Sequence, residues 1–212
     1  MAGLSSDRPR FWIVAGPNGC GKSTAYGHGS VAGLDGSVWI INPDLLTVRL
    51  KDAENLDLLS ANLAAVQRIE SWLDASIEVH QTIGVETVLS SPKYRRLVEK
   101  AKAHDFEVCL VHVYLQTAEM QLERIKARVV KGGHDVPPDK VRDRRKRSFD
   151  QLPWFFSQAE RAWILDNSGE SPAVVAIRDK NENLGFSFDT DLILGELFDR
   201  IWQELVPSEL KR

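Results

Sequence analysis

Short apolar segments alternate along the chain with longer segments in which apolar residues recur every three or four positions. The short segments are rich in β-branched residues and mostly continuous, which is typical of strands covered on both faces. They lie at 11–15, 38–41, 83–89, 107–115, 162–165 and 173–177. The amphipathic segments predict helices at 22–30, about 55–80, 93–104, 117–131, 138–159 and 189–205. This alternation predicts a parallel sheet with helices on both faces.

The size and composition fit one globular domain over residues 1–212. Of the 212 residues, 43% are apolar and 27% are charged, which is ordinary for such a domain. No segment approaches the roughly 20 apolar residues that a membrane span needs, and the polar first ten residues lack a signal core. The two cysteines do not form a disulfide framework, and we expect a cytoplasmic protein. The net charge of −3 weighs against broad nucleic-acid or membrane binding.

A phosphate-binding motif, G-x-x-x-x-G-K-S, directly follows the first predicted strand. Its glycines let the backbone curl so that successive N–H groups point at phosphate oxygens. Lys22 can reach the β- and γ-phosphates of ATP, and the Ser23 hydroxyl can hold Mg²⁺. We expect ATP contacts from Gly16, Pro17, Asn18, Gly19, Cys20, Gly21, Lys22, Ser23 and Thr24.

Polar residues follow the other predicted strands, at the sheet edge where such folds bind ligands. Asp44 is expected both to cap a helix and to accept the proton of a substrate hydroxyl. Glu86 interrupts an apolar strand, which favours a carboxylate that grips a polar substrate or a metal-bound water. A structural ion pair or a turn of the strand towards solvent stays open for Glu86. Ser90 and Ser91 could add hydroxyl contacts to a substrate or begin a helix.

Positive charge is concentrated between residues 124 and 147 of this acidic chain. Gly132-Gly133 and Pro137-Pro138 interrupt the segment and are suitable for a hinged flap. Beside a phosphate-binding loop, arginines on such a flap can neutralise a transferring phosphoryl group. We therefore predict a helical lid over 117–159, although a solvated basic surface or a nucleic-acid patch remains an alternative. The candidate arginines are Arg128 before the hinge and Arg142, Arg144 and Arg145 after it.

Other enzyme classes fit the chain less well, since it lacks zinc-ligand spacing, a dinucleotide motif, an ABC-ATPase signature and a guanine-binding motif. The order of its motifs is that of small-substrate P-loop kinases. We predict an α/β P-loop NTPase fold of three layers, α/β/α, with a mainly parallel central sheet and an arginine-rich lid. Two other functions stay open: an ATP-binding switch with weak hydrolysis, and a polynucleotide kinase.

Within these kinases the chain resembles the zeta-toxin family. The matching segments are 15–24, 42–44, 86–90, 128–137, 142–148 and 166–169, and Gly132-Gly-His-Asp-Val-Pro137 is the most specific. The resemblance implies an ATP-dependent kinase that phosphorylates a hydroxyl, such as one on UDP-N-acetylglucosamine, and that is held inactive by a small helical antitoxin. One departure is Val88, where zeta toxins have threonine.

The resemblance also implies roles for particular residues. Lys22 and Ser23 would bind ATP and Mg²⁺, and Asp44 would be the base. Glu86 would hold the sugar substrate, with Ser90 nearby. Phosphates would be clamped by Arg128 together with Arg142 or Arg145. Asn167 would lie near the nucleotide base.

Overall fold

The computed structural model describes residues 8–27, 31, 33–34, 38–133, 135–180, 187–189 and 194–205. Within this part of the chain, strands form one sheet in the order β2-β3-β1-β4-β5-β6-β7. Their bounds are β1 (Arg10–Ala15), β2 (Ile40–Ile41), β3 (Ile83–Thr87), β4 (Glu107–Tyr114), β5 (Arg161–Asp166), β6 (Ala173–Asp179) and β7 (Ser187–Phe188).

Strands β1 to β5 run parallel to one another, as predicted. β6 runs antiparallel to β5, which is consistent with the prediction of a mainly parallel sheet. The physical reason is the connection, because the short segment 167–172 can join a hairpin but not a parallel crossover. β7, which the sequence pattern did not predict, adds antiparallel to β6.

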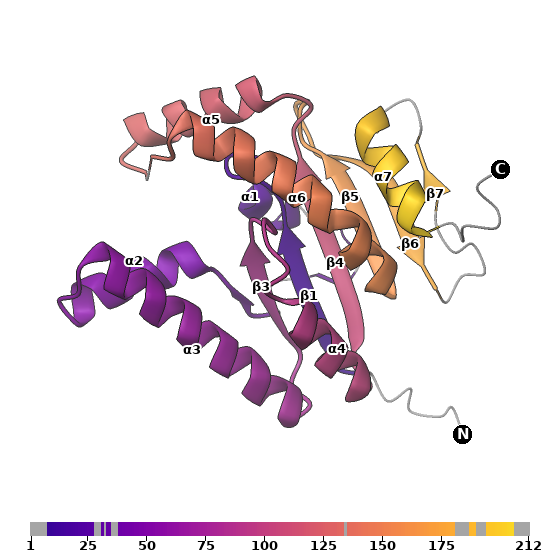
Figure 1. Cartoon of the computed structure of the whole chain (residues 1–212), viewed down its shortest axis with the longest axis horizontal. Coiled ribbons are helices and arrows are strands. Elements are labelled where there is room, and N and C mark those ends of the chain that lie inside the picture. The colour runs from indigo at the N-terminus through magenta and orange to yellow at the C-terminus, as the bar shows by residue number, and fades with distance from the viewer. Residues whose placement is uncertain are drawn as a thin grey trace.

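Helices cover the sheet on both faces (Figure 1). Their bounds are α1 (Lys22–Gly27), α2 (Pro43–Ala53), α3 (Leu58–Glu78), α4 (Arg95–Ala103), α5 (Ala118–Val130), α6 (Pro138–Gln158) and α7 (Gly195–Leu205). The three-layer α/β architecture with a mainly parallel sheet is therefore confirmed. The predicted ends at 28–30 and 190–193 lie outside the described residues, as does His134 of the Gly-Gly-His motif.

Alternate residues of β1 belong to the two different cores. Phe11 and Ile13 pack in the larger core with residues of α3, α4, α6 and α7. Trp12 and Val14 pack in the smaller core on the opposite face, where the Trp12 ring stacks on Trp163 at 5.9 Å between centroids. Because β1 is buried on both sides, the loop that follows it begins from a rigid base.

The predicted lid segment consists of the hairpin α5–α6. In Figure 1, α6 runs across the sheet, and its second half is buried in the larger core through Phe149, Leu152, Phe155 and Phe156. Ile125, Val136 and Val141 form a separate small apolar cluster that joins the two helices. The basic first half of α6 thus packs against α5 and lies near the sheet edge that carries the P-loop.

Two further findings concern the environment of the chain. None of the helices described here has both the length and the hydropathy to cross a bilayer. Cys20 and Cys109 are buried free thiols, and burial raises the pKa of each above its usual value.

Candidate active site

The P-loop, residues 16–23, has a backbone that only glycine can follow at critical points. Gly16 has a φ of 144°, and a Cβ there would lie 2.1 Å from the carbonyl oxygen of Val113. Gly21 has a φ of 84°, and a Cβ there would lie 2.4 Å from Nδ2 of Asn167. Both positions combine a left-handed backbone with a close neighbour, so a side chain at either would distort the loop.

Asn167, directly after β5, makes contacts that support the P-loop. Its Nδ2 donates to the Cys20 carbonyl over 2.8 Å, and its own carbonyl accepts from Arg124 of α5 over 2.7 Å. The zeta-toxin resemblance implies that Asn167 lies near the nucleotide base. The structure places its side chain against the loop backbone, beside Gly21. The Asn167 side chain therefore helps to shape the P-loop, and its contact with the nucleotide base stays a prediction.

Lys22, Ser23 and Glu86 form a compact polar group at the start of α1. Nζ of Lys22 donates to the carbonyl of Gly16 over 2.9 Å and lies 3.8 Å from Oε1 of Glu86. The Ser23 hydroxyl donates to Oε2 of Glu86 over 3.1 Å. The Lys22 side chain is only 9% exposed and that of Glu86 only 12%. The open alternative of an ion pair for Glu86 is thus realised with Lys22, and a hydrogen bond from Ser23 adds to it. These are the two P-loop residues that are predicted to bind phosphate and magnesium.

Asp44 occupies the second position of α2 rather than its cap. The N-cap is Asn42, whose Oδ1 accepts from the backbone N–H groups of Asp44 and Leu45 over 2.9 and 3.2 Å. The prediction that Asp44 caps this helix is wrong, because Pro43 suits the first helical position and leaves Asn42 to cap. The consequence is chemical, since the Asp44 carboxylate is not used by the helix backbone and is exposed at the cavity wall.

The loop after β3 turns sharply over the site. Leu89 is buried with a φ of 58°, and its N–H donates to the Thr87 hydroxyl over 3.0 Å. A branched side chain in this region of backbone space is strained and needs surrounding contacts to hold it. The turn brings Ser90 and Ser91 to the cavity and carries the chain on to Lys93 and Tyr94.

The lid arginines differ in where their guanidinium groups lie. Arg144 donates to Oδ1 of Asn18 in the P-loop over 3.1 Å. Arg145 is buried, donates to the carbonyls of Leu115 and Gln116 over 2.6 and 2.9 Å, and covers the Phe149 ring. This burial lowers the pKa of Arg145.

Neither of the other two candidate arginines lines the cavity. Arg142 is half exposed and lies 3.5 Å from the Glu119 carboxylate. Arg128 is exposed in the last turn of α5. Arg144 is therefore the candidate arginine that contacts the P-loop and lines the cavity, and the sequence grouped it with the other arginines without singling it out.

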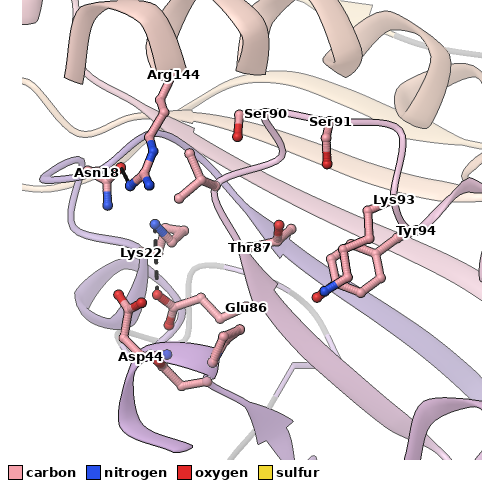
Figure 2. Close-up of a pocket in the computed structure, with 13 residues that line it drawn as sticks. Asn18, Lys22, Asp44, Glu86, Thr87, Ser90, Ser91, Lys93, Tyr94 and Arg144 are labelled. Carbon is pink, nitrogen blue, oxygen red and sulfur yellow. Dashed lines mark hydrogen bonds and ion pairs between the residues drawn. The ribbon is translucent and has the colours of Figure 1, made fainter. Parts of the chain in front are cut away.

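A cavity of about 220 Å³ opens beside the P-loop. Figure 2 shows Lys22, Asp44 and Glu86 together at one side, with Arg144 and Asn18 next to them. Lys93 and Tyr94 lie on the opposite side, and Ser90 and Ser91 lie along the loop between. The complete lining is Asn18, Lys22, Asn42, Pro43, Asp44, Glu86, Thr87, Val88, Ser90, Ser91, Lys93, Tyr94 and Arg144.

Metal binding here would depend on a hydroxyl and a carboxylate. The described residues contain no group of three or more His, Cys, Asp or Glu side chains that could hold a metal ion. The oxygens of Ser23 and Glu86, 3.1 Å apart, are nevertheless the hard ligands that Mg²⁺ prefers, and at nucleotide sites this ion takes its remaining ligands from phosphates and water.

His112 is buried in β4, below the site. Its Nε2 lies 3.2 Å from the Ser148 hydroxyl, and its Nδ1 has no hydrogen-bond partner in the structure. Burial, reinforced by the nearby positive charges of Lys22 and Arg145, lowers the pKa of His112 from 6.5 to about 3. The imidazole is therefore neutral at physiological pH and lies within the core.

Comparison with known proteins places this geometry in a family. Residues 11–152, from β1 into α6, match the family of the AAA domain. The chain belongs to the AAA domain family. The match covers the P-loop, Asp44, Glu86 and the arginines of α5 and α6.

Relatives of this AAA domain protein extend the comparison. An uncharacterized protein of Haemophilus influenzae is 28% identical over 144 residues, which cover 65% of this chain and 98% of that protein. The crystal structure of AvrRxo1-ORF1:-ORF2 with ATP superposes with a TM-score of 0.67 at 17% identity. That alignment covers 95% of this chain and only 65% of the AvrRxo1 chain.

A second solved structure is the PezAT chromosomal toxin–antitoxin system of Streptococcus pneumoniae. Its TM-score is 0.64 at 17% identity, and the alignment covers 95% of this chain and 88% of that one. At these identities the likeness shows the fold, and the predicted P-loop NTPase fold of this AAA domain protein is confirmed.

Some residues of the site were not predicted from the sequence. Lys93 and Tyr94 directly follow Ser90-Ser91-Pro92, so the sheet-edge rule that selected Ser90 would have found them if extended by one turn. Asn42 carried the signal of a cap placed before a proline. Arg124 lies beside Gly21, and only the packing of α5 against the P-loop distinguishes it from its basic neighbours.

Proposed function

We propose that this protein is a kinase that transfers the γ-phosphate of ATP to a hydroxyl group of a small molecule. The observation that carries the proposal is the cavity shared by the P-loop lysine, an exposed carboxylate and a lid arginine. A protein that only binds or hydrolyses ATP has no need of a cavity that extends from its phosphate-binding lysine to Ser90, Lys93 and Tyr94. A kinase needs one, because the acceptor must lie in line with the γ-phosphate.

Each residue of the proposed mechanism acts on a defined atom. The P-loop N–H groups hold the phosphate oxygens, and Lys22 leaves the Gly16 carbonyl to bind the β- and γ-phosphates. Asp44 accepts the proton of the acceptor hydroxyl as its oxygen bonds to the γ-phosphorus. The bond between the γ-phosphorus and the β–γ bridging oxygen breaks, and ADP leaves with the bonding electrons. Arg144 neutralises the charge of the phosphoryl group in transit.

Ser23 and Glu86 are suited to hold Mg²⁺ with the nucleotide, Ser23 directly and Glu86 directly or through a bound water. The ion would neutralise charge that develops on the β- and γ-phosphate oxygens. This assignment differs from the expected grip of Glu86 on the sugar substrate. It is favoured because both oxygens of Glu86 face the P-loop residues Ser23 and Lys22.

For the phosphate acceptor and the protein partner, the zeta-toxin resemblance indicates what to test first. UDP-N-acetylglucosamine is the first acceptor to test, with Ser90 and its neighbours as contacts. A small antitoxin is the partner to seek. Two structural neighbours, AvrRxo1-ORF1:-ORF2 and the PezAT toxin–antitoxin system, each consist of two different proteins. The former was crystallised with ATP. These likenesses support the proposal at the level of the fold.

The test is to incubate the purified protein with γ-labelled ATP, Mg²⁺ and a metabolite extract, and to identify labelled products. We expect a labelled small molecule whose formation is lost in Lys22→Ala. UDP-N-acetylglucosamine and a short oligonucleotide are assayed in parallel as single acceptors. ATP hydrolysis without any labelled acceptor would contradict the proposal and favour a nucleotide-driven switch. Labelling confined to oligonucleotide ends would favour a polynucleotide kinase.

A further inference from the structure

The acceptor side of the cavity differs in charge from the P-loop side. Both carboxylates that line the cavity, Asp44 and Glu86, lie on the P-loop side together with Lys22 and Arg144. The opposite side presents the Lys93 ammonium with the hydroxyls of the loop between (Figure 2). The two cations near the P-loop face the place of the ATP phosphates, which leaves Lys93 for the acceptor.

Lys93 is held at the cavity by contacts that still leave it able to bind. Its Nζ lies 5.0 Å from the centroid of the Tyr94 ring and 3.5 Å from a Glu70 carboxylate oxygen. The Glu70 side chain is 41% exposed, so water screens this long ion pair, and the Lys93 side chain itself is 26% exposed. An anion inside the cavity would meet Lys93 in a less hydrated place than Glu70 does.

We infer that the acceptor carries an anionic group, and that Lys93, with hydroxyl donors from Ser90 and Ser91, binds this group while the reacting hydroxyl lies at Asp44. The inference rests on the proposed function, because it assigns the side of the cavity away from the P-loop to the acceptor. The anion is a carboxylate or phosphate on a compact molecule, since the cavity volume of about 220 Å³ is below the roughly 300–1,000 Å³ of sites that enclose drug-sized ligands. A nucleotide-sugar could present its diphosphate there only by extending out of the cavity.

The experiment compares matched neutral and anionic probes on protein whose P-loop is already filled. Calorimetry first measures binding of a non-hydrolysable ATP analogue with Mg²⁺, and the saturated complex is then titrated with each probe. The pairs are glucose with gluconate, glucose with glucose 6-phosphate, and N-acetylglucosamine with UDP-N-acetylglucosamine. They test in turn whether the anionic group that is bound is a carboxylate, a phosphate or a diphosphate. We expect at least one anionic probe to bind about 10-fold or more tightly than its neutral partner, as a charge-assisted hydrogen bond would give.

Lys93→Gln should abolish that preference while leaving binding of the ATP analogue unchanged. Lys51→Gln, which removes an exposed positive charge on α2 away from the cavity, is the matched control and should keep the preference. If an anionic probe is phosphorylated, Lys93→Gln should raise its KM about 10-fold or more with little change in kcat.

Three results would overturn the inference: equal affinity of all neutral and anionic partners, no binding by any anionic probe, or a preference that survives in Lys93→Gln. A loss of preference in Lys51→Gln as large as in Lys93→Gln would also overturn it, because the effect would then come from overall charge. Failure of the proposed function has a different signature, since the ATP analogue itself would not bind, or would bind with no transfer to any acceptor in the extract.

Discussion

Arg144, in the first half of α6, donates a hydrogen bond to the side-chain oxygen of Asn18 in the P-loop over 3.1 Å. This contact joins two segments that are 126 residues apart in the chain. Asn18 lies between the glycines of the loop, so the guanidinium is held close to where a γ-phosphate would lie. The neutral amide of Asn18 is an exchangeable partner, and a phosphate oxygen would be a stronger acceptor for the same guanidinium.

Replacing Arg144 should therefore affect catalysis more than folding. We expect Arg144→Ala to lower kcat about 100-fold or more, as loss of one donor to a transition-state charge typically does. The measurement is steady-state transfer from γ-labelled ATP, with thermal unfolding as the check on folding. Arg142→Ala, which removes a neighbouring exposed arginine of the same helix, is the matched control and should retain most of the activity. Equal losses in the two variants would contradict the assignment of Arg144.

Arg145 should behave in the opposite way. Its guanidinium satisfies the buried carbonyls after β4, so Arg145→Ala should lower the free energy of unfolding by about 3 kcal/mol. Urea unfolding followed by fluorescence measures this loss, and Arg142→Ala again serves as the comparison. A fully stable Arg145→Ala protein with strongly reduced transfer would instead support a direct role of Arg145 on phosphate.

Asp44 should be needed for turnover and not for nucleotide binding. Asp44→Asn keeps the size of the side chain and the cap formed by Asn42, so α2 should persist. We expect kcat to fall about 100- to 10,000-fold, the usual contribution of a general base, while the affinity for the ATP analogue changes little. Transfer at the wild-type rate in this variant would rule out Asp44 as the base.

Glu86 offers a test between magnesium and acceptor binding. If Glu86 supports Mg²⁺ beside Ser23, then Glu86→Gln should raise the Mg²⁺ concentration needed for half-maximal transfer. Its KM for the acceptor should change little at saturating Mg²⁺. Titrations of Mg²⁺ and of acceptor in the wild type and the variant separate the two roles. A raised acceptor KM with an unchanged Mg²⁺ requirement would restore the sugar-binding role.

His112 should make the fold sensitive to acid. Its folded pKa of about 3 is below the ordinary 6.5, so between these values the unfolded chain binds a proton that the folded chain does not. Stability from this site is therefore present above pH 6.5 and is lost as pH falls towards 3. From pH 7 to pH 5 the loss is about 2 kcal/mol.

His112→Gln removes this titration. The free energy of unfolding of the variant, relative to that of the wild type, should therefore be about 2 kcal/mol higher at pH 5 than at pH 7. Urea unfolding at both pH values gives the four free energies. His104→Gln, a change outside the core, controls for the removal of a histidine. A difference between wild type and His112→Gln that is the same at pH 7 and pH 5 would contradict the buried neutral imidazole.

The sequence predicted which residues line the site much better than it predicted which of them contact one another. Asp44, Glu86 and Ser90 were selected by one rule, that loops after parallel strands meet at one sheet edge, and all three line the same cavity as Lys22 of the P-loop motif. The rule gives location but not contact, so it could not tell whether Glu86 faces an acceptor or Ser23. The cap of α2 was misassigned because the two polar residues on either side of Pro43, Asn42 and Asp44, both suit a helix start.

By itself the sequence determined the P-loop, the strand that leads into it and the set of edge residues, because these depend on short motifs and on local periodicity. Tertiary packing alone decided which arginine lies over the loop. Successive helix residues are about 100° apart, so Arg144 and Arg145 face different neighbours, and only the docking of α6 on β4 and the P-loop assigns them. Packing likewise decided that Lys93 lies opposite Asp44, since the turn at Leu89 sets the path of the loop between them.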